Sequence, residues 1–550
     1  MNKEYGKTSF ILLGILVLFA CENHDFNSQS INLVPSEPSD TPSYWCTWAT
    51  QNYGADTTVF MNANFGINGH SGQANVLTED HLFDPNGWLV AFPKAQKDLY
   101  VMYDAGWDVP FGVDFDGNQR WKLGSLELAD DKFPSCTGNP AERLTKMNQM
   151  TKDAGWKGAA IWIAAHPYGY GQNGKFETND EIEAYYRERV RWCKEAGVEY
   201  WKVDYGYLGG DLKFREMLTR IAAEEYHGMW VEHCIGGGPF NDDECPWDTP
   251  NFGKTGRYAN WDNKVNLALQ CLEFSDVFRT YDVTSHLSIP TTIDRCAAIL
   301  KAAKQKPASK AILNCEDEPY LGAVLGSAIG IMRHPSHFQI DGYYYDPLHV
   351  KTKTNEVERA VLWQRIAPAF SVGMTPINVS DEILKDTYTF KKGDTWANWA
   401  IGQKIMQAAP ARIARNMALP VVESNSQPPF VICCKNPNNS IAVATLGRVN
   451  DEKGFYFPSA DVTIKEVDWQ HHIGIFGRYK SLTLEGADIP AESRIFAQDL
   501  IAEEATDITS MVEITKNSIV ISGKVIENIG LASASKNDTS APGMVLKVIF

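Results

Sequence analysis

The sequence has no excess of basic residues. It contains 51 Lys and Arg against 68 Asp and Glu, which gives a formal net charge of −17, and no basic run. Contacts to a phosphate backbone depend on clustered cations, so we expect no nucleic acid partner. Hydrophobic residues make up 44% of the chain, and the mean hydropathy is −0.29. This composition excludes a disordered, collagen-like or polytopic membrane protein.

Cysteine patterns typical of metal sites are absent. None of the 11 cysteines belongs to a CxxC pair or to a cysteine–histidine cluster with zinc spacing. We therefore predict no metal, and the sequence gives no sign of a dissociable cofactor. Disulfide pairing cannot be read from the sequence.

Long hydrophobic runs are absent except near the N-terminus. Lys3 and Lys7 precede an apolar run over residues 9–20, which is too short to span a bilayer but fits the core of a signal peptide. The run leads into Leu-Phe-Ala-Cys at residues 18–21, which resembles the bacterial lipobox, where the cysteine carries the lipid.

We therefore predict a lipoprotein signal peptide over residues 1–21, with lipidation at Cys21. Residues 22–43, rich in Asn, Ser, Pro and Glu, are predicted to form a flexible tether. The protein is expected to be exported and held by acyl chains on a bacterial membrane, in the periplasm or at the cell surface. An ordinary secretory signal is the alternative, and the sequence does not indicate which leaflet carries the anchor.

Short β-branched or aromatic runs alternate with longer amphipathic segments between residues 44 and 405. This alternation indicates an α/β fold with a parallel sheet, and eight units fit a (β/α)₈ TIM barrel better than an open sheet. The expected strands are residues 44–50, 98–104, 158–165, 199–205, 229–234, 277–282, 311–317 and 370–377. The expected helices include residues 141–154, 179–196, 211–226, 263–273 and 291–305.

After about residue 410 the pattern changes. Apolar segments such as residues 430–434, 440–445 and 518–522 are separated by Asn, Gly and Pro turns, with no long helical period between them. We therefore predict a C-terminal antiparallel β domain over residues 410–550, organised as a sandwich.

Carboxylates stand at the ends of several predicted barrel strands. In a barrel these ends meet on one face, and an acid placed there needs a reason because burying an unpaired charge is costly. Two such carboxylates facing one sugar can hydrolyse a glycoside: one attacks the anomeric carbon and the other moves the proton. Lys202 would point to the same side of its strand as Asp204 and keep that carboxylate ionised. The strand-end acids are Asp104, Asp204, Glu232, Asp282 and Glu316.

Aromatic residues are numerous, with 16 Trp, 22 Tyr and 25 Phe. Flat apolar rings suit the faces of sugars, and a large aromatic core is the alternative interpretation. Trp45 and Trp107 are the rings near strand ends that we assign to sugar binding, whereas packing between barrel and helices explains Trp162 and Trp201 equally well.

Taken in order, the strand-end motifs resemble those of clan D glycoside hydrolases, the melibiase-type α-galactosidases of families 27 and 36. Residues 201–204 (WKVD) are similar to the family's Lys-x-Asp after strand four. Residues 232–238 (EHCIGGG) resemble its Glu-x-Cys-x-x-Gly-Gly-Gly loop, one residue shorter here. Residues 278–282 (FRTYD) correspond to its strand-six segment, residues 104–107 (DAGW) to its Asp-Asp-Gly-Trp, and residues 44–48 (YWCTW) to its first strand.

The resemblance implies a retaining, exo-acting glycoside hydrolase of the α-galactosidase type. Asp204 would be the nucleophile that forms the covalent glycosyl intermediate, and Asp282 the acid/base. The residues that the resemblance assigns to substrate binding are Asp104, Trp107, Lys202, Glu232, Cys234, Gly236, Gly237, Arg279 and Trp45.

The identity of the sugar is left open by one departure from the family pattern. Ala105 replaces the second Asp of the family's Asp-Asp-Gly-Trp, and in α-galactosidases this acid pair holds the 4- and 6-hydroxyls. The same machinery acting on a β-L-arabinopyranoside or an α-N-acetylgalactosaminide is one alternative. A non-catalytic carbohydrate-binding lipoprotein is another. A glycan is the partner in every case, and the sequence indicates neither the linkage nor the oligomeric state.

Overall fold

The structure is a computed structural model that describes residues 31–54, 69–235, 268–280, 286–304, 309–333, 354–391, 394, 402, 404–536 and 538–550. The predicted signal peptide with Cys21 lies outside these residues, as do Gly236, Gly237 and Asp282. In the part of the chain that is described, no helix is both long and apolar enough to cross a bilayer. Residues 32–550 form one compact unit, and the domain limits at 405 and 410 stay predictions.

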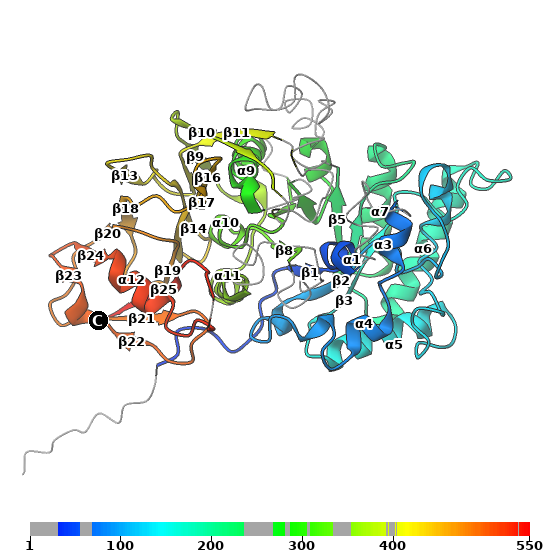
Figure 1. Ribbon diagram of the computed structural model, residues 1–550, viewed down its shortest axis with the longest axis horizontal. Helices are drawn as coiled ribbons and strands as arrows, with labels where there is room; N and C mark the ends of the chain where they lie inside the picture. Colours follow the sequence, from blue (N-terminus) through cyan, green and yellow to red (C-terminus); the bar gives the residue numbers. More distant parts are fainter. Residues whose placement is uncertain are drawn as a thin grey trace, which may run out of the picture. The chain divides into compact units, whose positions relative to one another are not determined.

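Eight parallel strands form the barrel, in the order β7-β6-β5-β4-β3-β2-β1-β8, which confirms the predicted TIM barrel. Figure 1 labels β1, β2, β3, β5 and β8 of this sheet. β1 pairs with β2 on one side and with β8 on the other. A single parallel bridge between Asn314 and Ala328 joins β7 to the segment before β8 and closes the ring. The strands are β1 (Tyr44–Cys46), β2 (Tyr100–Tyr103), β3 (Gly158–Ile163), β4 (Tyr200–Val203), β5 (Trp230–Cys234), β6 (Val277–Arg279), β7 (Ile312–Asn314) and β8 (Gly330–Ile331).

Several barrel helices begin and end at local capping signals. Asn139 and Glu142 form a capping box at the start of α5, and Thr178 and Glu181 form another at the start of α6. α6 ends at Gly197, whose φ of 65° lies in the left-handed region that glycine adopts without strain. The helices are α1 (Trp48–Gly54), α3 (Gly69–Ala74), α4 (Glu79–Phe83), α5 (Pro140–Asp153), α6 (Asn179–Ala196), α7 (Leu212–Glu225), α9 (Ile289–Ala303), α10 (Pro319–Leu325) and α11 (Thr354–Ile366).

The eighth strand was predicted at the wrong place. The barrel closes with β8, two residues long, whereas residues 370–377 lead into β9 (Ile377–Val379), which pairs antiparallel with β12 (Arg412–Arg415) outside the barrel. A two-residue strand leaves no pattern of its own, because its hydrogen bonds come from neighbours far away in sequence. The predicted helix over 263–273 falls largely on residues that are not described.

The later part of the chain forms three sheets, in which most strand pairs are antiparallel and a few, such as β12 with β14, are parallel. Side chains from the eight-stranded and five-stranded sheets share one apolar core, as in a sandwich, so the fold predicted for this part is confirmed. The remaining strands are β10 (Ile383–Thr389), β11 (Lys404–Pro410), β13 (Val421–Glu423), β14 (Phe430–Lys435), β15 (Ile441–Leu446), β16 (Arg448–Asn450), β17 (Gly454–Tyr456), β18 (Asp461–Val467), β19 (Ile473–Phe476), β20 (Ser481–Gly486), β21 (Arg494–Asp499), β22 (Thr506–Asp507), β23 (Glu513–Ile514), β24 (Ser518–Ser522) and β25 (Gly543–Ile549), together with helix α12 (Gly523–Gly530).

Candidate active site

Alternate residues of the barrel strands face inward, and they stack in layers along the barrel axis. A lower layer surrounds Glu232 of β5, which is fully buried. Its carboxylate accepts hydrogen bonds from the hydroxyls of Tyr44 at 3.0 Å and Tyr200 at 2.8 Å, and from the amide of Asn314 at 2.8 Å. The lower layer is therefore a buried network in which the carboxylate of Glu232 is hydrogen-bonded on both oxygens.

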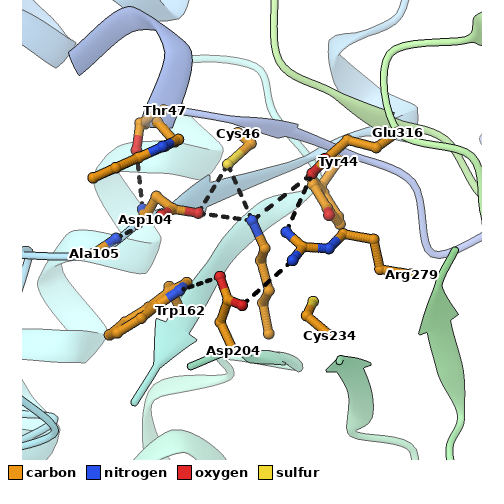
Figure 2. Close-up of polar contacts among 12 residues, drawn as sticks. Tyr44, Cys46, Thr47, Asp104, Ala105, Trp162, Asp204, Cys234, Arg279 and Glu316 are labelled. Atoms are coloured by element: carbon orange, nitrogen blue, oxygen red, sulfur yellow. Dashed lines mark hydrogen bonds and ion pairs between the residues drawn. The ribbon is translucent and has the colours of Figure 1, made fainter. Parts of the chain in front are cut away.

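A charged layer lies above the lower layer, toward the carboxyl ends of the strands. It consists of Cys46, Asp104, Lys202, Arg279 and Glu316, all of them buried. Figure 2 shows Cys46 of β1, Asp104 after β2, Arg279 of β6 and Glu316 after β7 converging, and the ion pairs of Lys202 place its ammonium among them. Five of the eight strands therefore contribute one polar group each near the height where the loops begin.

Lys202 is the centre of the charged layer. Its ammonium lies 2.9 Å from Asp104 Oδ2, 3.7 Å from Cys46 Sγ and 3.9 Å from Glu316 Oε1. Burial by itself would lower the pKa of Lys202, but Asp104, Cys46 and Glu316 outweigh it and hold the pKa well above its ordinary value. Lys202 is therefore a fixed cation.

Asp104 is held in one orientation by its surroundings. Its Oδ1 accepts the backbone N–H of Ala105 at 2.8 Å, and its own N–H donates to Thr47 Oγ1 at 2.9 Å. The thiol of Cys46 donates to Oδ2 at 3.0 Å. Asp104 is therefore bound to the ends of both β1 and β2 in addition to Lys202.

Asp204 lies directly after β4, on the outer side of the charged layer, and 22% of its side chain is exposed. Its Oδ1 lies 3.3 Å from Arg279 Nη2, and its Oδ2 accepts the indole N–H of Trp162 at 3.0 Å (Figure 2). Burial raises the pKa of Asp204, but Arg279, Lys202 and the Trp162 N–H together bring it below its ordinary value. Asp204 is therefore a carboxylate that is ionised, oriented and reachable from solvent.

Arg215 of α7 fixes the strand ends on either side of this carboxylate. One of its guanidinium nitrogens donates to the backbone carbonyls of Asp204 and Cys234, each at 2.9 Å, and another donates to the carbonyl of Val203 at 3.0 Å. The ends of β4 and β5 are thereby tied to one buried cation, which limits how far Asp204 can move.

The structure brings five of the predicted site residues together: Asp104, Lys202, Asp204, Cys234 and Arg279 lie around one mouth (Figure 2). Glu232 lies below them in the lower layer. Trp107 is buried and donates its indole N–H to the carbonyl of Trp162, and Trp45 is buried and donates to the carbonyl of Arg333. The sugar-binding roles of Glu232, Trp107 and Trp45 stay predictions, and the geometry of Asp282, Gly236 and Gly237 is not described.

Three contributors to the site were not assigned to catalysis or substrate binding: Cys46, Trp162, which was weighed as a packing ring, and Glu316, which was named only as a strand-end acid. Cys46 and Glu316 follow the inward-facing Tyr44 and Asn314 by two residues, so the alternation along the strand could have identified them. Trp162 of β3 could not have been found in this way, because its indole N–H reaches Asp204 on the neighbouring strand.

Among the described residues, no group of three His, Cys, Asp or Glu side chains is arranged to hold a metal ion. The charged groups at Asp204 are carboxyls paired with cations, since Lys202 lies beside Asp104 and Arg279 lies beside Asp204 and Glu316. Such a set can bind hydroxyls, stabilise a developing positive charge, or supply a carboxylate nucleophile.

Comparisons with known proteins give only distant likenesses. No protein-family model matches the chain, and no curated protein matches its sequence. Among solved structures, a family 27 β-L-arabinopyranosidase from Geobacillus stearothermophilus has 10% identity and a TM-score of 0.37, over 92% of this chain and 96% of that one. An α-amylase from Geobacillus thermoleovorans has 7% identity and a TM-score of 0.39, over 93% and 99%.

A pyruvate carboxylase from Rhizobium etli is also among the similar structures, with 13% identity and a TM-score of 0.27 over 59% of this chain and 28% of that one. At such scores these likenesses say nothing about the reaction or the substrate of this chain.

Proposed function

We propose that this protein is a retaining, exo-acting glycoside hydrolase of the α-galactosidase type. The observation that carries the proposal is the Asp204 carboxylate, ionised between Arg279 and Trp162 at the mouth of the barrel and partly open to solvent. A carboxylate in this setting suits attack on an anomeric carbon, since it is oriented in advance and keeps its negative charge.

In the proposed double displacement, Asp204 attacks the anomeric carbon of the terminal sugar and forms a glycosyl ester. The leaving oxygen takes a proton from an acid, which the sequence resemblance assigns to Asp282, outside the described residues. The same group then removes a proton from water, which attacks the ester and releases the sugar. Two carboxyl groups about 5–5.5 Å apart are expected for this retaining pathway.

The terminal sugar is proposed to lie against Asp204, with Asp104 and Lys202 binding its hydroxyls. Ala105, whose backbone carbonyl accepts from Gln51 at 3.1 Å, has no carboxylate to offer to a 6-hydroxyl. Hydrolysis of a β-L-arabinopyranoside and of an α-N-acetylgalactosaminide by the same mechanism is therefore tested beside hydrolysis of an α-galactoside.

The test is turnover of a panel of 4-nitrophenyl glycosides by the wild-type chain and by Asp204→Ala. We expect Asp204→Ala to lower kcat/KM for the accepted glycoside at least about a thousandfold, because it removes the nucleophile. Added azide, a small external nucleophile, should restore part of the activity. Asp153→Ala, which removes an exposed carboxylate at the end of α5, is the matched control and should retain full activity.

Unchanged hydrolysis by Asp204→Ala would refute the assignment of the nucleophile. Binding of glycans by the wild-type chain without turnover of any glycoside would favour the non-catalytic carbohydrate-binding protein.

We also propose that the protein is exported and lipid-anchored through Cys21, on the basis of the lipobox-like tetrapeptide at residues 18–21. In a bacterial host fed an alkyne-labelled fatty acid, the wild-type chain should become labelled and sediment with membranes. Cys21→Ala should lose the label, and Cys136→Ala, which removes a buried cysteine of the described part, should keep it. Equal labelling of the wild-type chain and Cys21→Ala would contradict the anchor.

A further inference from the structure

Aromatic side chains gather at the mouth of the barrel beside Asp204. They come from three loops that follow neighbouring strands: the 3-10 helix η3 (Gly117–Lys122) after β2, residues 164–170 after β3, and residues 204–208 after β4. We call the set the aromatic rim; its members are Trp121, Tyr168, Tyr170, Tyr205 and Tyr207.

The aromatic rim begins at the candidate nucleophile. Trp162, which donates to Asp204, lies 5.6 Å from the ring of Tyr205, and Tyr207 follows two residues later. The rings of Tyr207 and Tyr170 lie 6.0 Å apart with planes inclined by only 27°. The rim therefore begins beside Asp204 and follows the loop after β4 to Tyr207, which lies against Tyr170 of the loop after β3.

The outer rings of the rim face solvent. Tyr207 is 46% exposed and Tyr168 is 39% exposed, and Tyr170 is half-buried. In the part of the chain that the structure describes, the hydroxyls of these three tyrosines make no hydrogen bond. Each of these tyrosines therefore offers an apolar ring face and a hydroxyl that can form hydrogen bonds. A pyranose ring is complementary, because its C–H face can stack on the ring and its hydroxyls can bond to the phenol.

The rim is held rigidly from behind by His166. Its Nε2–H donates to the carbonyl of Arg120 at 2.8 Å, its Nδ1 accepts the backbone N–H of Tyr207 at 3.2 Å, and its ring lies 4.8 Å from that of Tyr207. Burial lowers the pKa of His166 to about 4, so it stays neutral and keeps both hydrogen bonds at physiological pH. A surface fixed in advance loses little conformational freedom when it binds.

Tyr168 also lines a pocket with a volume of about 470 Å³. Its wall combines the rings of Tyr168, Phe176 and Tyr185 with polar groups of Ser125, Lys175 and Glu181. Volumes of this order and mixed linings are typical of small-molecule sites. Tyr168 belongs both to the rim, where its ring lies 6.0 Å from that of Trp121, and to the wall of this pocket.

We propose that the aromatic rim binds the sugars that follow the terminal one, so that the natural substrate is an oligosaccharide or polysaccharide chain rather than a short glycoside. The proposal rests on the proposed function, which places the terminal sugar at Asp204. Sugar rings stack on Tyr207 and Tyr170, and the chain continues past Tyr168 into the pocket.

The test is affinity electrophoresis of the full chain in native gels containing galactomannan, arabinogalactan or arabinoxylan. All samples carry Asp204→Ala, so that the polysaccharide is not degraded during the run. We expect retardation in at least one gel, and an apparent Kd about tenfold higher after Tyr207→Ala or Tyr170→Ala. Phe111→Ala, which removes a 62% exposed ring after β2 that is not part of the rim, is the matched control and should leave the Kd unchanged.

The 4-nitrophenyl glycoside panel on the chain with Asp204 intact separates this proposal from the proposed function. Turnover of a glycoside without retardation in any gel would refute sugar binding by the aromatic rim and support the proposed hydrolase. Turnover with equal retardation of the tyrosine variants and the parent would have the same meaning. Retardation that depends on Tyr207 and Tyr170 without any turnover would support the rim and refute the hydrolase.

Discussion

At the scale of single residues, the site depends on cations that are each shared between carboxyl groups. Lys202 lies between Asp104 and Glu316, and Arg279 lies between Asp204 and Glu316. Removing one cation therefore changes the environment of two acids at once. Burial opposes the charge of Asp204, so this charge depends on the cations beside it.

Arg279→Met is predicted to raise the pKa of Asp204, because the largest influence that lowers this pKa is removed. Since the nucleophile must be ionised, the acidic limb of the pH profile of kcat/KM should move to higher pH. Arg191→Gln removes an exposed guanidinium on α6 and should leave the limb in place. An acidic limb that stays at the same pH in Arg279→Met would show that Arg279 does not control the charge of Asp204.

At the scale of elements, the mouth of the barrel depends on the close contact between the loops after β3 and β4. The N–H of Ala165 donates to the carbonyl of Tyr205 at 3.0 Å, and the N–H of Leu208 donates to the carbonyl of Ala165 at 2.9 Å. Gly206 lies between them, where a Cβ atom would come within 2.7 Å of the Ala165 carbonyl group and 2.6 Å of His166 Nδ1. Only glycine allows this approach, which positions Asp204 and Tyr207 on either side.

Gly206→Ala is predicted to push the two loops apart. The overpacking should lower the free energy of unfolding by ~1–3 kcal/mol and lower kcat/KM, because Asp204 moves with its loop. Gly210→Ala is the control in the same loop, since nothing lies within 4 Å of the added Cβ. Urea unfolding gives the free energy of unfolding of both variants, and assays give their kcat/KM. Equal stability of the two variants would rule out the close contact between the loops after β3 and β4.

At the scale of the whole molecule, buried polar contacts join the barrel to the sheets that follow it. Arg359 of α11 forms a two-pronged ion pair with Asp499 of β21, at 2.8 and 2.9 Å, and both side chains are completely buried. The hydroxyl of Tyr320 in α10 donates to the carbonyl of Ala541 at 2.7 Å. These contacts explain why residues 32–550 form one compact unit.

Arg359→Met is predicted to destabilise the whole unit. It leaves the Asp499 carboxylate buried without its cation, and breaking such a pair costs ~3–5 kcal/mol. Arg494→Met removes the partner of Asp507 from the same strand, but Arg494 is 62% exposed, so its loss should cost less than about 1 kcal/mol. Denaturant unfolding measures the free energy of unfolding of both variants. Similar decreases in the two would show that the buried Arg359–Asp499 pair stabilises the protein no more than the exposed pair does.

The sequence by itself determined the features that depend on local pattern. The alternation of strands and amphipathic helices predicted the barrel, and seven strands and the helices α5, α6, α7 and α9 lie where that pattern places them. The acids Asp104 and Asp204 were also identifiable from the sequence. A charged residue directly after a buried barrel strand lies at the end of the barrel where the loops and the site are found.

The tertiary structure decided the features that depend on contacts between distant segments. β8 exists because β1 supplies its hydrogen bonds, so no pattern within residues 330–331 could predict it. Glu232 was predicted at a strand end like Asp204, but it lies in the middle of β5 and is enclosed by Tyr44 and Tyr200, whereas Asp204 follows β4 and is partly exposed. Whether an acid is enclosed or reachable depends on how the eight strands close into a ring, and this is a property of the whole barrel rather than of any one strand.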